Sequence, residues 1–192
     1  MRIAVFSDIH DSVWKLDAAL AAVPAADAMI CCGDLCSPFI VHQLGRGFAK
    51  PIHIVFGNND GDLFRIAANA RRYPHMHLHG EWFRGEFEGR VVAAHHFDDV
   101  ARVVAASEQF DLLCFGHNHI YEVSRLGRTL AVNPGAIMGA IFAPDGSRTD
   151  VASTFAVYDT VAGEAQGFLV EQDGILRPID SGPAVAARRA RR

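Results

Sequence analysis

The sequence predicts an α/β fold built around one sizeable core. The chain has 192 residues, of which 50% are hydrophobic, enough to bury a core without disulfides or a structural metal. Its first third alternates short apolar runs with longer segments of helical period, the pattern of strand–helix–strand units. From Pro74 onward, strand-like runs follow one another across glycine turns, which predicts a strand-rich second half.

Three strand–helix units are expected in the first third. The first predicted helix has its apolar residues on one face and is closed by Pro24. The second is expected after Ser37 and Pro38, a capping serine followed by proline at the first helical position. The predicted strands are residues 3–6, 28–32 and 52–56, and the predicted helices are residues 14–23, 38 to about 45, and Asp60 or Asp62 to 70.

The rest of the chain is expected to be mostly strands. A hairpin is predicted from residues 82–87 and 90–94 across Glu88 and Gly89. Residues 99–109 are the one convincing helix of this half, and residues 144–150 form a polar loop. Further strands are expected at residues 112–115, 121–126, 129–132, 154–158 and 167–170.

Charge and hydropathy argue against two classes of partner. Four arginines lie in the last five residues, so residues 1–187 hold 14 basic against 22 acidic residues, a net charge of −8. A segment with this negative charge is expected to bind nucleic acid poorly, because affinity for nucleic acid depends on clustered Lys and Arg. No apolar stretch approaches the roughly 20 residues of a membrane span, and no signal peptide is evident. A cytoplasmic protein with four reduced cysteines is therefore expected.

Polar side chains gather where the predicted strands end. The carboxyl ends of strands in an open α/β sheet converge on one crevice, so these groups are expected to lie together. Two carboxylates, an amide and several imidazoles form a mixed ligand set that favours Mn, Fe, Zn or Ni over Ca²⁺. About eight potential ligands suit two ions that share a bridging carboxylate. These polar side chains occur in five short segments of the sequence, which are Asp8-Ile9-His10, Gly33-Asp34, Gly57-Asn58-Asn59-Asp60, His95-His96 and Gly116-His117-Asn118-His119.

Glycines and further histidines surround these motifs. Gly33, Gly57 and Gly116 each precede a candidate ligand, where positive φ or a close backbone approach would aim the next side chain. Three histidines alternate along residues 75–79, which places them on one face of a predicted strand. We expect them to form a solvated face and not a third metal site.

Taken in order, the motifs resemble those of the calcineurin-like metallophosphoesterases. Asp-x-His, Gly-Asp, Gly-Asn-x-Asp, a histidine after a strand and Gly-His-x-His follow one another between about residues 1 and 170. The small size is similar to the compact prokaryotic YfcE-type phosphodiesterase branch. The resemblance implies a four-layer αββα sandwich of two mixed β-sheets flanked by helices, with a dinuclear metal site on one edge. Residues 1–175 would form this single domain, and residues 176–192 a flexible basic tail.

The resemblance also implies a role for each motif residue. Asp34 would bridge two divalent ions, with manganese expected and iron, zinc or nickel as alternatives. A hydroxide held between the ions would attack phosphorus in line. Asp60 would lie behind the ligands and orient the group beside the leaving oxygen, next to Asn59. The implied ligands are Asp8, His10 and His119 for one ion, and Asn58, His95 and His117 for the other.

Three positions depart from the family pattern. Asn59 stands where many members carry a histidine that protonates the leaving group, and an amide cannot act as a general acid. Asp11 stands where glycine is common and adds a negative charge near the metals. The usual His-Gly-His reads His95-His96-Phe97, which leaves the ligand open between the two histidines. We expect His95, because it directly follows an apolar run.

These features predict a metal-dependent phosphodiesterase acting on a small phosphodiester substrate. Two alternatives have the same fold: a phosphomonoesterase, and a non-catalytic protein-interaction scaffold such as the retromer subunit. The scaffold interpretation predicts loss of metal-site histidines, whereas every motif here keeps its ligand type. Exposed hairpin strands in the second half can pair between chains, which leaves a homo-oligomer open.

Overall fold

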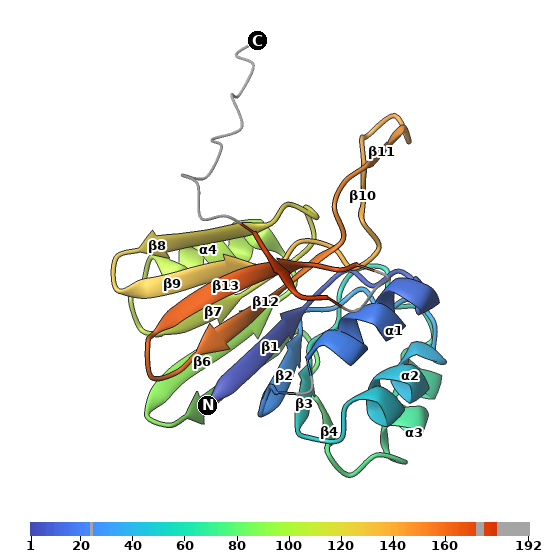
Figure 1. Ribbon diagram of the computed structural model, residues 1–192, viewed down its shortest axis with the longest axis horizontal. Helices are drawn as coiled ribbons and strands as arrows, with labels where there is room; N and C mark the ends of the chain where they lie inside the picture. Colours follow the sequence, from blue (N-terminus) through green and yellow to red (C-terminus); the bar gives the residue numbers. More distant parts are fainter. Residues whose placement is uncertain (24, 172–174, 180–192) are drawn as a thin grey trace.

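Two β-sheets pack face to face at the centre of the molecule, and helices cover both outer faces. The computed structural model describes residues 1–23, 25–171 and 175–179, which form the four-layer αββα sandwich that the resemblance implied. Figure 1 shows α1 (Val13–Ala22), α2 (Ile40–Gly47) and α3 (Leu63–Ala70) on one side of the sheets and α4 (Asp98–Ala105) on the opposite side.

The first sheet has seven strands, and one half of it is parallel. In spatial order the strands are β14 (Arg177–Pro178), β13 (Glu164–Leu169), β12 (Thr154–Asp159), β1 (Arg2–Phe6), β2 (Ala28–Cys31), β3 (Ile52–Ile54) and β4 (Met76–Leu78). β1, β2, β3 and β4 pair in parallel, as strand–helix–strand units require. On the other side of β1, the strands β12, β13 and β14 pair antiparallel.

The second sheet has five strands and lies against the first. In spatial order they are β5 (Trp82–Phe87), β6 (Arg90–His95), β7 (Leu112–Cys114), β9 (Thr129–Asn133) and β8 (Glu122–Leu126). β6, β7 and β9 run parallel between antiparallel edge strands, and β5 with β6 forms the hairpin expected across Glu88 and Gly89. A separate hairpin of β10 (Ala140–Phe142) and β11 (Arg148–Asp150) projects from the sandwich in Figure 1.

Alternation along the strands divides the core into layers. In β1, Ile3 and Val5 point between the two sheets, whereas Ala4 and Phe6 point toward the helices. A smaller cluster fills the space between the second sheet and α4. The central parallel strands are therefore buried on both faces, which explains why they appear in the sequence as continuous apolar runs.

Two helix starts differ from the sequence predictions. α2 begins at Ile40 and not directly after Ser37, because the Ser37 side chain donates a hydrogen bond to Asp11 instead of capping the helix. Asp62, not Asp60, caps α3 by accepting a backbone N–H group of its first turn.

The second half differs in two further places, and one short strand lies beyond residue 175. Part of the polar loop expected at residues 144–150 is the strand β11, and α4 ends at Ala105, before the expected residue 109. β14 pairs with β13 just beyond the domain boundary expected at residue 175. Most of the expected tail, from residue 180 onward, lies outside the described residues. Within the described ranges, no helix is long and apolar enough to cross a membrane.

We predict that Gly45→Ala destabilises the protein, although alanine normally favours a helix interior by about 1 kcal/mol. A Cβ atom at Gly45 would lie 2.5 Å from Cγ of Tyr73, whose hydroxyl is hydrogen-bonded to His42. We expect the free energy of unfolding, measured by denaturant titration, to fall by about 1–2 kcal/mol. Gly47→Ala is the matched control, because the nearest atom to its Cβ would be Cδ1, at the flexible end of the Leu20 side chain, at 2.6 Å. A stabilised Gly45→Ala protein would contradict this packing.

Candidate metal centre

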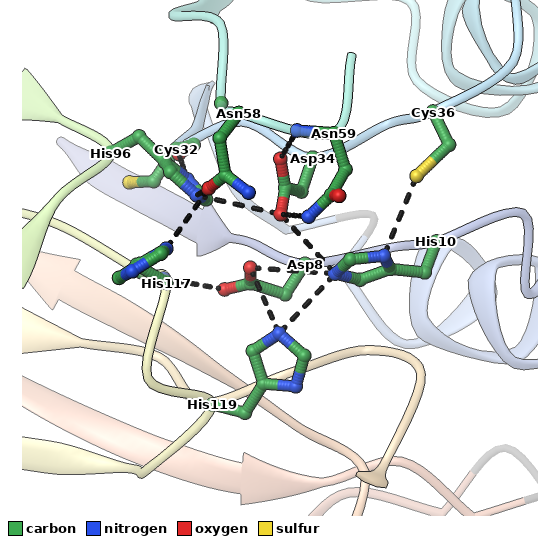
Figure 2. A network of polar contacts seen from close by, with 12 residues as sticks. Asp8, His10, Cys32, Asp34, Cys36, Asn58, Asn59, His96, His117 and His119 are labelled. Carbon is green, nitrogen blue, oxygen red and sulfur yellow. Dashed lines mark hydrogen bonds and ion pairs between the residues drawn. The ribbon is translucent and has the colours of Figure 1, made fainter. Parts of the chain in front are cut away.

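Polar side chains from the ends of five strands meet at one edge of the sandwich (Figure 2). They are Asp8 and His10 after β1, Asp34 after β2, Asn58 after β3, His96 after β6, and His117 and His119 after β7. β1, β2 and β3 belong to the first sheet, whereas β6 and β7 belong to the second. The site therefore exists only where the two sheets are packed together.

Four of these residues bring potential ligand atoms close together. Asp8, His10, Asp34 and His119 each offer one such atom, and these atoms lie within 4.8 Å of one another. His10 Nε2 lies 3.3 Å from Asp34 Oδ2, and His119 Nε2 lies 3.3 Å from Asp8 Oδ1. The Nε2 atoms of His10 and His119 are 3.2 Å apart. Both carboxylates are buried, so their charges need partners within the protein.

Asp34 also borders a second group of potential ligands. His96 Nε2 lies 3.4 Å from Asp34 Oδ2 and 3.1 Å from Asn58 Oδ1. His117 Nδ1 lies 3.0 Å from the same Asn58 oxygen. Oδ2 of Asp34 is thus close to an imidazole nitrogen of each group, since it also approaches His10 Nε2.

The structure corrects the choice between the two adjacent histidines. The sequence predicts His95 at this site, but His95 is the last residue of β6 and its ring lies against Trp82 and Phe97. His96 is 1% exposed and takes the position expected for His95. Strand pleating is the reason: Ala94 faces the layer between the sheets, so His96 continues on that side and His95 points the other way.

Three imidazoles turn Nε2 toward the site and have Nδ1 in contact with another group. A proton held at Nδ1 leaves the Nε2 lone pair free, which is the usual arrangement of a metal-binding histidine. These supporting contacts were not apparent in the sequence, because they join residues far apart in the chain. They are His96 Nδ1 with the Cys32 carbonyl oxygen at 2.8 Å, His119 Nδ1 with the Ala140 carbonyl oxygen at 2.5 Å, and His10 Nδ1 with Cys36 Sγ at 3.4 Å.

The backbone that carries the ligands is unusual. Nine non-glycine residues of the described ranges have positive φ, and seven lie in these loops: Asp8, His10, Asp11, Asp34, Cys36, His117 and His119. Of the three glycines expected to supply such turns, only Gly33 has positive φ. Gly57 and Gly116 permit close approach instead: a Cβ at Gly57 would lie 2.2 Å from Asp34 Oδ1, and one at Gly116 would lie 2.5 Å from Asp8 Oδ2.

Asp60 joins two loops that carry candidate ligands, and it lies behind them as the resemblance implied. Its role beside the leaving group stays a prediction. Its carboxylate accepts hydrogen bonds from four backbone N–H groups, those of Asp34, Leu35, Cys36 and Gly57. Asn59 donates from its backbone N–H and from Nδ2 to the two oxygens of Asp34, each at 2.8 Å. These two neighbours therefore fix the position and the orientation of the Asp34 carboxylate.

Two other polar residues support the loops. The Asp11 carboxylate accepts hydrogen bonds from the backbone N–H and the hydroxyl of Ser37. Asn133, buried at the end of β9, donates to Asn118 between the two histidines that follow β7. Through this hydrogen bond and a second one to the Gly116 carbonyl oxygen, Asn133 holds that loop.

The buried carboxylates and imidazoles shift one another's pKa. Burial opposes ionisation of Asp8, but the nearby imidazoles of His10 and His119 outweigh it and lower the pKa to about 2. Burial also disfavours the charged form of His10, but contacts with Asp34 and Asp8 raise its pKa to about 11. Burial opposes the charged form of Asp34, His96 and His119 as well. Contacts between carboxylates and imidazoles nevertheless lower the pKa of Asp34 and raise the pKa values of His96 and His119. Protons and metal ions would therefore compete for the same nitrogens.

The donor set fits divalent metal ions. Asp8 Oδ1 is buried and has no hydrogen-bond partner among the residues that the structure describes. With protons at Nδ1, His10 and His119 would direct two lone pairs at each other across 3.2 Å, which a cation beside them would satisfy. Carboxylate and amide oxygens combined with imidazole nitrogens are ligands for Mn, Fe, Zn and Ni.

Sequence comparison identifies the family. The model of the calcineurin-like phosphoesterase superfamily domain matches residues 1–163. The phosphodiesterase MJ0936 of Methanocaldococcus jannaschii is 24% identical over 143 residues, which cover 72% of this chain and 86% of that protein. More than half of the chain thus matches one family.

Solved structures agree with the fold. An archaeal phosphodiesterase superposes with a TM-score of 0.76 at 21% identity, covering 88% of this chain and 99% of the other. Vps29 from Entamoeba histolytica, in a complex with Zn²⁺, gives 0.64 at 16% identity, covering 93% and 97%. YfcE, a phosphoesterase from E. coli, gives 0.58 at 17%, covering 93% and 98%. The chain belongs to the calcineurin-like phosphoesterase superfamily and is a hydrolase of the class that acts on phosphoric ester bonds.

Proposed function

We propose that the chain is a phosphodiesterase with a dinuclear metal site bridged by Asp34. The observation that supports this most is the position of Asp34 Oδ2, which lies 3.3 Å from His10 Nε2 and 3.4 Å from His96 Nε2. A carboxylate oxygen between two groups of ligands suits two ions that share it. We assign Asp8, His10 and His119 to one ion and Asn58, His96 and His117 to the other, with Mn²⁺ as the expected metal.

The chain's own residues hold the ligands in position. When bound, the two ions would supply positive charge to the phosphoryl oxygens and would lower the pKa of water enough to provide a hydroxide nucleophile. Asn59 restrains the Asp34 carboxylate through two hydrogen bonds. Cys36 and the carbonyl groups of Cys32 and Ala140 restrain the imidazoles. Because the metal-bound hydroxide would attack phosphorus and the protein residues would only hold the ligands, no side chain needs to act as a nucleophile.

Charge and the lack of a general acid favour a diester over a monoester. The candidate ligands include the carboxylates of Asp8 and Asp34, with the Asp60 carboxylate directly behind Asp34, and none of the candidate ligands is a Lys or Arg. A doubly charged monoester would be repelled more strongly there than a singly charged diester. Asn59 replaces a proton-donating histidine, so substrates with good leaving groups are favoured. The phosphomonoesterase and scaffold alternatives predict other results in the assay below.

The decisive experiment is hydrolysis of a chromogenic phosphodiester and its monoester counterpart by chelated protein reloaded with Mn²⁺. We expect the diester to be cleaved faster, and Asp34→Asn to lower its rate more than about 100-fold, because supporting contacts alone contribute 10–100-fold at such sites. Asp11→Asn is the matched control, since that carboxylate is turned toward Ser37. Faster cleavage of the monoester would favour the phosphomonoesterase. Cleavage of neither ester by metal-loaded protein would favour the scaffold.

Two adjacent substitutions test the assignment of the ligand after β6. His96→Ala should remove a nitrogen that lies 3.4 Å from Asp34 Oδ2, so Mn²⁺ binding and diester hydrolysis should both be lost. His95→Ala should leave both close to wild type, because that ring packs against Trp82 and Phe97. Bound metal can be counted by elemental analysis after dialysis. Loss of metal in His95→Ala alone would reverse the assignment.

Metal affinity should increase with pH. Without metal, the pKa of His10, raised to about 11, keeps a proton on that ring at neutral pH, and the pKa values of His96 and His119 are shifted in the same direction. Bound metal must displace every proton that occupies a ligand nitrogen. Between about pH 6 and about pH 8, we expect Mn²⁺ affinity to rise about tenfold per pH unit for each proton released. Calorimetric titration in two buffers of different ionisation enthalpy would count those protons. An affinity that does not change with pH would contradict this expectation.

A further inference from the structure

One lysine of α1 contacts the segment that leads from β9 to β10. Lys15 is the third residue of α1 and follows the candidate ligand His10 by five positions. Its ammonium group donates a hydrogen bond to the Met138 carbonyl oxygen at 2.7 Å. The same group lies against Gly139, because a Cβ atom there would be 2.7 Å from Lys15 Nζ. Lys15 thus connects a helix near the start of the chain to a loop near its end.

This loop is tied to two candidate ligands of the same ion. The Met138 N–H donates to the Asp8 carbonyl oxygen at 3.0 Å. Two residues further on, the Ala140 carbonyl oxygen lies 2.5 Å from His119 Nδ1. Asp8 and His119 are both assigned to the ion of the proposed centre that His10 would also hold, so this inference rests on the proposed function. The position of Met138 therefore affects how the ligands of that ion are held.

The Met138 carbonyl depends on Lys15 more than its neighbour in the loop does. Ile137 is held from both sides, since its N–H donates to the Ser7 carbonyl oxygen and its own carbonyl oxygen accepts from the Ser153 hydroxyl. Within the described ranges, Lys15 is the one residue that donates to the Met138 carbonyl oxygen. Removing the ammonium would therefore leave this carbonyl, directly before Gly139, without a protein partner.

The charge of Lys15 strengthens this contact. No carboxylate lies within ion-pair distance of Lys15 in the part of the chain that the structure describes, whereas Lys50 pairs with Asp27. An ionised donor forms a stronger hydrogen bond than a neutral one. We propose that Lys15 is a positioning residue of the metal centre. It fixes the Met138 carbonyl and, through Ala140, the orientation of the His119 ring.

Two effects of Lys15 on a bound cation have opposite signs. As a positive charge, the ammonium repels the ion, so its removal would raise metal affinity. As a support for His119, it favours binding, because loss of a group that orients a metal ligand typically lowers affinity 10–100-fold. Lys15 is only partly buried, so water and salt screen the repulsion. We expect the support to outweigh the repulsion.

The test is calorimetric titration of Mn²⁺ into the full-length chelated protein. Lys15→Met keeps most of the apolar stem and removes the donor. We expect the affinity for one bound Mn²⁺ to fall about tenfold, the lower end of the usual range, because Lys15 acts on His119 through Ala140. Lys50→Met is the matched control: Lys50 also donates to a backbone carbonyl, that of Ala26, but at the amino ends of β2 and β3, opposite the metal centre. Its Mn²⁺ affinity should equal that of the wild type.

A second measurement follows the His119 ring directly. In a proton–nitrogen correlation spectrum of labelled, chelated protein, we expect the Nδ1–H signal of His119 to shift or broaden in Lys15→Met and to stay unchanged in Lys50→Met. A merely structural lysine would not change this signal, and circular dichroism would verify that both variants are folded.

The proposal requires both results. An Mn²⁺ affinity of Lys15→Met that equals or exceeds the wild-type value would overturn it, and so would an unchanged His119 signal. Failure of the phosphodiesterase proposal would appear in a different place, as wild-type protein that binds Mn²⁺ and cleaves neither ester. Neither the titration nor the ring spectrum depends on ester cleavage.

Discussion

The burial of two carboxylates at the junction of the two sheets is the constraint on which the site depends. Asp8 and Asp34 are 0% and 1% exposed, and an ionised carboxylate removed from water is strongly destabilising unless it is compensated. The compensation comes from imidazoles of both sheets and from N–H groups, including the His117 N–H to Asp8 and the Asn59 N–H to Asp34. A bound cation would complete it.

This constraint accounts for the unusual backbone around the site. Seven non-glycine residues take positive φ so that side chains at the ends of different strands can turn toward one centre. Such conformations persist only when surrounding contacts stabilise them. The Asp60 carboxylate supplies some of these contacts, because it accepts hydrogen bonds from four backbone N–H groups of two loops. Gly57 and Gly116 matter for a different reason, because any Cβ there would collide with the aspartates.

The sequence predicted what depends on local pattern and missed what depends on contacts between distant residues. The parallel strands, the β5–β6 hairpin and the motifs at strand ends are visible because apolar runs end in polar residues. β11 was missed because its residues are all exposed and polar, so no apolar alternation marks it. His96 was passed over although the alternation of Val92 and Ala94 indicated its side of the strand. The carbonyl contacts of His96 and His119 join residues 64 and 21 positions apart, which no sequence pattern reports.

The division of the candidate ligands between two sheets couples the site to the packing of the sandwich. Asp8, Asp34 and Asn58 come from the first sheet, and His96, His117 and His119 from the second. Directly behind the ligands, Cys32 and Cys114 are buried in the layer that joins the sheets, and the Cys32 carbonyl orients His96. A small change in how the sheets pack would therefore move one half of the ligands relative to the other. Because the ligands converge only in the folded chain, metal binding would in turn stabilise the contact between the two sheets.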